Sequence, residues 1–273
     1  MRYLTIFITF TISFYLFGQD FHCQEEVYQG SPVTFVISPV EDSYDCTFSV
    51  EAKAIGIFNT LLFERTLTVL DRGFKGSILK ANSKMDSIIN GDRAPERDQE
   101  AKRWWTAISS FSPYTFYHED KLTVPVTGGR HSSPFGFKRK TKYPSGKESI
   151  VIHNGEDYAL PIGTTVYSDG AGRVILAENR IVSGNTVIIE HLPGVISMYY
   201  HMDILNVNIG DIVTNKTKIG EIGTTGFSTG PHIHWEVRFS TIPVDPKLFI
   251  STPLIDKTLI IDMISSTNNK RGG

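Results

Sequence analysis

The chain has 273 residues, of which 40% are apolar and 21% are charged, and its formal net charge is -2. An apolar fraction of this size can build a core, so wholesale disorder is excluded. The near-neutral charge argues against a protein built around nucleic acid, because binding a phosphate backbone requires a basic excess. At roughly 150 residues per domain, the length suggests two domains.

The first residues resemble a targeting segment. Arg2 precedes an apolar run from Leu4 to Gly18, which then breaks into Gln19 and Asp20. This pattern predicts a signal peptide over residues 1–18 and export to the periplasm or the extracellular space. A membrane anchor is the alternative, although the run is shorter than the roughly 20 residues that cross a bilayer. No other stretch approaches that length, so the mature protein is predicted to be soluble.

Both cysteines, Cys23 and Cys46, follow this segment closely. In an oxidising compartment a disulfide between them is plausible, and two unpaired thiols are the alternative. A lipid on Cys23 is disfavoured, because the three residues before it lack the small and aliphatic side chains of bacterial lipidation sites.

The chain up to residue 120 has two patterns. Short β-branched runs, such as Val33 to Ile37 and Leu67 to Leu70, predict a small β-rich domain over residues 19–75. Residues 76–120 are predicted to be a helical connector, with Pro95 at a first helical position. Its apolar residues have helical spacing: Ile78, Leu79, Met85, Ile88 and Ile89.

Two features of this region have a functional and a structural interpretation. Trp104 and Trp105 could stack on a carbohydrate, but packing in an interdomain core is favoured. Residues 102–147 carry nine lysines and arginines against two acids, Glu119 and Asp120. Such a stretch could attract an anionic cell-wall polymer, whereas solvated loops are the favoured interpretation.

The second half carries most of the glycine and histidine. Fifteen of the 23 glycines fall between Gly128 and Gly230, and six of the eight histidines lie within or just beside that stretch. Short β-branched or aromatic runs between turn residues predict antiparallel strands that close into a sandwich or partial barrel. We expect this domain over residues 121–250 and a tail over 251–273. The predicted strands are Gly163 to Ser168, Gly172 to Ala177, Asn185 to Glu190, Val195 to Tyr200 and Pro231 to Arg238.

Two short motifs in this half suit a metal. His232 and His234 are two apart in a predicted strand, so both project from one face. His153 and Asp157 are four apart and would share a face if extended, and Gly155 between them leaves room for a metal or substrate. Histidine and carboxylate ligands without cysteine suit zinc, and three protein ligands plus a water form a catalytic site.

Tyr199, Tyr200 and His201 end another predicted strand and add an imidazole that need not bind metal. The motifs together offer four histidines and one carboxylate, which exceeds what a three-ligand site requires. Proton transfer at a bound water would need such additional groups.

The order of these motifs resembles the lysostaphin/LytM-type zinc metallopeptidases, peptidase family M23. The resemblance covers about residues 121–250. It implies the duplicated hybrid motif fold of that family, one zinc ion per chain held by His153, Asp157 and His234, and a catalytic pair of His201 and His232. Further matches are Ser133 to Phe137, Gly163 to Tyr167, Asp169, Gly170, Gly184, Asn185, His191, Gly220 to Gly223 and Thr225 to Gly230.

Some residues depart from the family pattern or have no settled place in it. Glu156 occupies a usually apolar position on the face opposite the ligands, so its charge needs a partner. Tyr143 is a candidate for the tyrosine that aids the transition state in some members. His191 is expected at a strand end or cleft rim. The remaining histidines are expected on the surface: His22, His118 and His131.

Three functions are compatible with these patterns. The first is an exported zinc endopeptidase that cuts peptide bonds of peptidoglycan, in stem peptides or cross-bridges. The second is a non-catalytic wall-associated or regulatory module of the same fold, and the third is a zinc peptidase that acts on ordinary proteins. Because all five site positions are occupied, the sequence favours an enzyme. No nucleic-acid partner is expected.

Overall fold

The computed structural model describes residues 73–255 except 113, 114 and 240, together with the backbone of four strands within residues 26–70. The chain divides into two compact units, which we call unit 1 (residues 1–73 and 255–273) and unit 2 (residues 74–254). The predicted signal peptide, His22, both cysteines and most of the expected tail lie outside the described residues. None of the described helices is long and apolar enough to cross a membrane.

Unit 1 contains a four-stranded sheet in the order β1-β4-β3-β2. The pair β1 and β4 is parallel, whereas β2 with β3 and β3 with β4 are antiparallel. The expected β-rich character of this part is therefore confirmed. The strands are β1 (Glu26–Tyr28), β2 (Val36–Ile37), β3 (Phe48–Ile55) and β4 (Leu61–Leu70).

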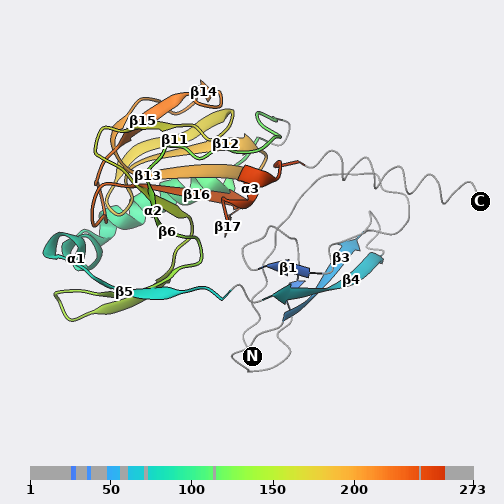
Figure 1. Cartoon of the computed structure of the whole chain (residues 1–273), viewed down its shortest axis with the longest axis horizontal. Coiled ribbons are helices and arrows are strands. Elements are labelled where there is room, and N and C mark those ends of the chain that lie inside the picture. Colours follow the sequence, from blue (N-terminus) through green and yellow to red (C-terminus); the bar gives the residue numbers. More distant parts are fainter. Residues whose placement is uncertain are drawn as a thin grey trace, which may run out of the picture. The chain divides into compact units, whose positions relative to one another are not determined.

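Unit 2 is mostly antiparallel β structure (Figure 1). Its large sheet has the order β14-β11-β12-β13-β16-β9-β6, with β15 beside β13 and β10, and β17 beside β16. A smaller sheet has the order β5-β7-β8. The elements are β5 (Gly76–Lys80), α1 (Ser83–Asn90), α2 (Ala94–Ser109), β6 (Arg130–Ser133), β7 (Lys138–Lys142), β8 (Glu148–Ile152), β9 (Glu156–Ala159), β10 (Thr165–Tyr167), β11 (Gly172–Arg180), β12 (Gly184–Leu192), β13 (Val195–Leu205), β14 (Ile212–Val213), β15 (Lys218–Ile222), β16 (Ile233–Phe239), β17 (Ile242–Val244) and α3 (Leu248–Ser251).

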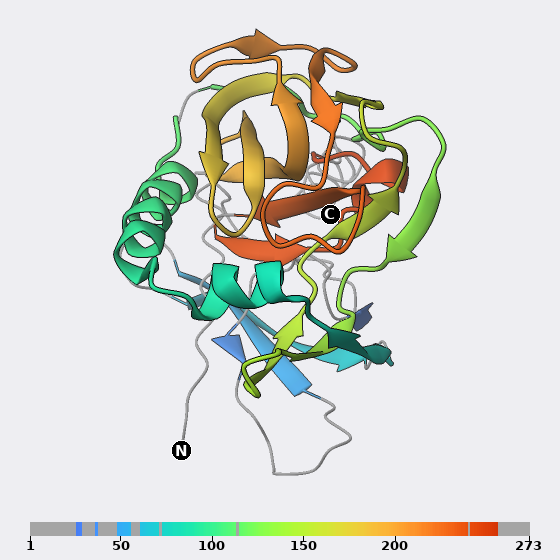
Figure 2. The ribbon, with the colours of Figure 1, turned by 90° about the vertical axis from the view of Figure 1, so that its left-hand side faces the viewer.

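The predicted strands of the second half are confirmed, as is the mainly β fold class. The central strands β12 and β16 are buried along nearly their whole length, because both faces of the sheet are covered. Helix α2 lies along one face, and the strands curl around the other (Figure 2). Apolar side chains fill the layer between α2 and the sheet: Ile108, Leu176, Ile188, Ile196 and Met198, with Trp104 packed against them.

The two helices begin where the local chemistry favours a helix start. The Asn82 side chain accepts a hydrogen bond from the backbone N–H of Met85 and caps α1. Pro95 occupies the first turn of α2, as predicted. The helical prediction was wrong for Ile78 and Leu79, which lie in β5, because parallel pairing with β7 outweighs their local spacing.

The tryptophan pair divides between core and surface. Trp104 is partly buried and packs against the core, but this core lies within unit 2 and not between domains. Trp105 remains 53% exposed. Helix α2 is thus part of the same compact unit as the large sheet.

Candidate metal centre

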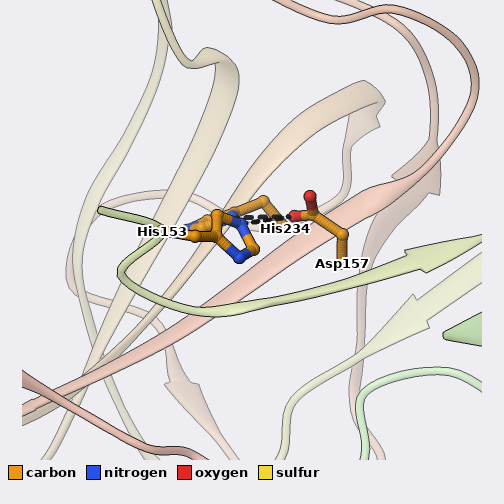
Figure 3. A group of neighbouring side chains, drawn as sticks. All are labelled: His153, Asp157 and His234. Carbon is orange, nitrogen blue, oxygen red and sulfur yellow. Dashed lines mark hydrogen bonds and ion pairs between the residues drawn. The ribbon is translucent and has the colours of Figure 1, made fainter. Parts of the chain in front are cut away.

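Three side chains from different segments meet at one end of β16 (Figure 3). His153 follows β8, Asp157 lies in β9, and His234 lies in β16 directly opposite Asp157 in the strand register. His153 Nε2, Asp157 Oδ1 and His234 Nδ1 are each 3.0 Å from the other two. All three residues are buried, with exposed fractions of 7%, 4% and 8%.

The sequence suggested that His153 and Asp157 share a strand face, but in the structure they do not. A turn between β8 and β9 separates them and folds their side chains toward each other. Gly155 in this turn leaves space for the backbone of Trp235 and the ring of His234, and not for a metal or substrate as the sequence suggested. A Cβ atom there would meet the carbonyl oxygen of Trp235 and would lie 3.0 Å from His234 Nε2.

Each candidate ligand is held by a second group on its far side. His153 Nδ1 donates to the carbonyl oxygen of Pro134 at 2.8 Å, and Arg139 binds Asp157 Oδ2 at 2.6 Å. His234 Nε2 lies 3.3 Å from Glu236 Oε2. These contacts leave one donor atom of each ligand for a metal, as in carboxylate–histidine–zinc arrangements.

This donor set fits zinc. Donor atoms about 2.1 Å from a tetrahedral zinc would lie about 3.4 Å apart, close to the 3.0 Å separations in the cluster. Two imidazoles, one carboxylate and no thiolate leave a fourth position for water, which is the composition of a catalytic zinc site. The geometry thus brings together the three residues that the sequence proposed as ligands.

The charges within the cluster couple its protonation states. Burial opposes ionisation of Asp157, but hydrogen bonds from His153 and His234 outweigh it and hold the pKa of that carboxyl well below its usual range. Burial also opposes protonation of His234. Asp157 and Glu236 outweigh it and raise the pKa of His234 to about 9. A cation at this position would therefore compete with a proton on His234.

His201 and His232 lie beside the cluster with their ring centroids 4.8 Å apart. His201 Nδ1 donates to the carbonyl oxygen of Thr225 at 2.9 Å, and His232 Nδ1 donates to that of Gly230 at 2.8 Å. Each ring therefore presents an unprotonated Nε2. That of His232 lies 3.9 Å from Asp157 Oδ1.

Both imidazoles of this pair are neutral at neutral pH. Burial lowers the pKa of His201 to about 3, and electrostatic interactions with the imidazoles of His232 and His234 lower it further. Burial likewise lowers the pKa of His232. His201 also has a φ of +65°, a left-handed conformation that is costly for a residue other than glycine and is typical of functional sites.

His191 lies in the core, so its expected place at a cleft rim was wrong, although it does lie near the end of β12. It is fully buried, and its ring contacts the carboxylate of Asp169 at 3.1 Å. Asp169 also accepts hydrogen bonds from Tyr199 Oη at 2.6 Å and Trp235 Nε1 at 2.7 Å. Trp235 faces away from His234, because neighbouring residues of a strand point to opposite faces.

Glu156 has the partners that its buried charge requires. Its carboxylate lies 3.1 Å from Lys247 Nζ, is paired with His131, and accepts a hydrogen bond from the backbone N–H of Phe135 at 3.0 Å. His131 is exposed, as predicted, but it also contributes to this cluster. His118 is half-buried, and its Nε2 lies 3.0 Å from the carbonyl oxygen of Lys121.

The sequence missed three side chains at the centre. Arg139 lies in the basic stretch and binds Asp157. Two of its neighbours in that stretch, Lys140 and Lys142, instead pair with Glu148, as is typical of a solvated surface. Glu236 continues the period of two that starts at His232, so the pattern could have revealed it. Tyr200 stacks on the His234 ring with centroids 5.0 Å apart.

Tyr143, the other candidate, is buried and lies within a different set of contacts. Its hydroxyl hydrogen-bonds with Ser149 Oγ at 3.1 Å, and its ring lies 6.4 Å from that of Phe227. Phe227 belongs to the segment that leads into His232. A transition-state role for Tyr143 stays a prediction.

Comparisons with known proteins agree with this geometry. The chain is 30% identical over 217 residues to the peptidoglycan DD-endopeptidase ShyB of Vibrio cholerae, covering 73% of this chain and 50% of that protein. It is 31% identical over 239 residues to ShyA, a peptidoglycan DD-endopeptidase of the same organism, covering 78% and 53%. The chain thus spans about half the length of these curated relatives.

A solved structure assigned to peptidase M23 from Pseudomonas aeruginosa superposes with a TM-score of 0.54 at 26% identity, covering 83% of this chain and 86% of that one. The model of Peptidase family M23 matches residues 151–246. The match to this family and the His-Asp-His donor set together confirm zinc as the expected cofactor. The chain carries a metallopeptidase domain of peptidase family M23.

Proposed function

We propose that this protein is an exported zinc-dependent endopeptidase that hydrolyses peptide bonds of peptidoglycan. The observation that carries the proposal is the meeting of His153, Asp157 and His234 at 3.0 Å separations, with the paired imidazoles of His201 and His232 beside them. A module that only binds the wall would not need all five groups.

His153, Asp157 and His234 would hold the zinc ion through Nε2, Oδ1 and Nδ1. A zinc ion bound there would lower the pKa of a water toward about 7 and polarise the carbonyl of the bond to be cut. The remaining steps fall to the chain's own side chains, and the neutral rings of His201 and His232 are suited to them.

Each ring of the pair is fixed by its Nδ1–H and presents Nε2 as a base. One imidazole accepts the proton of the attacking water at Nε2. The imidazole that has gained this proton is then a donor at Nε2, and it can stabilise the developing oxyanion or protonate the leaving amine. Nε2 is the unprotonated nitrogen in both rings, so either ring can take either role in this arrangement.

Two relatives named as peptidoglycan DD-endopeptidases support peptidoglycan as the substrate class. Export, by the predicted signal peptide over residues 1–18, would bring the protein to that substrate. A zinc peptidase of ordinary proteins is the alternative, because bond specificity depends on loops around the site.

Purified protein incubated with purified peptidoglycan, with fragments identified by mass spectrometry, tests the proposal. We expect peptide cleavage that stops with a chelator and returns with zinc. Asp157→Ala should stay inactive after zinc is restored. Cleavage of an unfolded protein but not of peptidoglycan would select the alternative substrate, and the absence of zinc-dependent cleavage of either would refute the enzyme.

A further inference from the structure

We propose that Glu236 is a positioning residue for the metal ligand His234, and that helix α2 holds Glu236 in place through Arg238 and Trp104. The inference concerns the metal site used in the proposed function and rests on that assignment. It extends the functional site to a helix outside residues 151–246, the region matched by the family model.

The network follows one face of a single strand. Residues 234, 236 and 238 alternate with inward-facing residues along β16, so their side chains lie in a row. His234 Nε2 lies 3.3 Å from Glu236 Oε2, and Arg238 Nε donates to Glu236 Oε1 at 2.6 Å. Glu236 is 2% exposed, so water cannot replace these partners.

The contact with Glu236 selects the tautomer of His234. An ionised carboxylate only accepts hydrogen bonds, so the hydrogen of the neutral imidazole must be on Nε2. The lone pair is then on Nδ1, the atom that lies 3.0 Å from both His153 Nε2 and Asp157 Oδ1. Without Glu236, the ring could place its hydrogen on Nδ1 and lose its metal-binding atom.

Arg238 keeps Glu236 ionised and in position. A buried carboxylate needs a partner for its charge, and Arg238 supplies it. The guanidinium is fixed at two further points: it donates through Nη1 to the carbonyl oxygen of Thr241 at 2.6 Å, and it lies 5.0 Å from the centroid of the Trp104 ring. Stacking of this kind suits the planar guanidinium.

Trp104 connects this row to the core. It packs in the layer formed by Ile108 of α2 and Met198 of β13. Tyr200, which stacks on the His234 ring, packs against the same layer. A displacement of α2 would therefore reach the metal ligand from two sides, through Arg238 and through Tyr200.

A purely structural ion pair would make different predictions from a positioning role. If Glu236 and Arg238 only stabilise the fold, replacing Glu236 should lower the melting temperature and leave the zinc affinity of the folded protein unchanged. If Glu236 positions His234, the zinc affinity should fall and the tautomer of His234 should change.

The test compares Glu236→Gln with Glu190→Gln in the full chain. Glu190 is a matched control, because it is fully buried and paired with Arg173 at 2.9 Å, away from the metal centre. Zinc affinity is measured by competition with a chelator, and the His234 tautomer by ¹⁵N NMR of the imidazole in the zinc-free protein at a pH above about 9, where the ring is neutral. We expect about 10- to 100-fold weaker zinc binding for Glu236→Gln, loss of the single Nε2–H tautomer, and less than a twofold change for Glu190→Gln.

A second pair of variants tests the helix. Trp104→Ala should weaken zinc binding several-fold, and Trp104→Phe, which keeps an aromatic face under Arg238, should restore most of it. Trp105→Ala, at the exposed neighbour, should have no effect. Should Glu236→Gln not fold, Glu236→Asp replaces it, because this change keeps the charge beside Arg238 but shortens the reach to His234.

Zinc affinity within twofold of the wild type in a folded Glu236 variant, with the Nε2–H tautomer retained, overturns the proposal. Unchanged affinity in Trp104→Ala removes α2 from it. These measurements are separate from peptidoglycan cleavage: a wild type that binds zinc but cuts nothing would refute the proposed function and leave the role of Glu236 intact.

Discussion

Asp169→Asn should destabilise unit 2 strongly while leaving the metal centre nearly intact. The Asp169 carboxylate is fully buried and accepts from Trp235 Nε1 on one oxygen, and from Tyr199 and Ser197 on the other, where His191 also lies. An asparagine has only one accepting oxygen in its side chain. The NH2 group of the asparagine side chain would therefore face a hydrogen-bond donor, either Trp235 or the group of Tyr199 and Ser197.

The magnitude follows from this mismatch. Removing one member of a buried, charged hydrogen-bond network costs about 3 to 5 kcal/mol, because the remaining groups lose their partner. The pKa of Asp169 is lowered, since hydrogen bonds and the charge of His191 outweigh burial. Its contribution is therefore present above the ordinary carboxyl pKa of about 3.9 and is lost as the pH falls through the lowered value.

Tryptophan fluorescence during urea unfolding, at fixed free zinc and pH 7, measures the free energy of unfolding. All three tryptophans of the chain, Trp104, Trp105 and Trp235, belong to unit 2, so the signal reports that unit alone. Asp211→Asn is the control, because Asp211 is exposed and accepts one turn hydrogen bond. A loss below about 1 kcal/mol in Asp169→Asn, similar to the control, would refute the account of this network.

Four further outcomes concern the metal centre. Because the pKa of His234 is raised to about 9, zinc must displace a proton from its ring. Zinc affinity should therefore rise about tenfold per pH unit from pH 6 to 8. Chelator competition measures this affinity, and an affinity that does not change with pH would contradict the prediction. His201→Ala should bind zinc as the wild type does but lose about 10²- to 10⁴-fold in kcat, measured on a peptidoglycan fragment, and an active variant removes His201 from the mechanism. Asp157→Ala should lose its zinc on dialysis, by metal analysis, whereas full retention of zinc would exclude Asp157 as a ligand. His234→Ala should behave as Asp157→Ala does, and a stoichiometric zinc content would exclude that residue.

The β class could be predicted because it depends on local patterns, whereas the set of three ligands was implied by the resemblance to peptidase family M23. Alternation of side chains along residues 231–238 placed His232 and His234 on one face, and turn residues bounded the strands around them. His153 and Asp157 were also identified, but for a wrong local reason. They meet because a turn at Gly155 joins two strands, and not because they share one.

The sequence by itself determined which residue types were available and where the strands would form. Only the tertiary structure decided what lies next to each of them. His191 was expected at a strand end or cleft rim, yet it lies in the core, where its ring contacts the carboxylate of Asp169. Arg139 read as part of a solvated basic stretch, yet it binds Asp157 from another sheet. Such pairings join residues far apart in the chain, and periodicity carries no information about them, because it reports only which way a side chain faces along its own element.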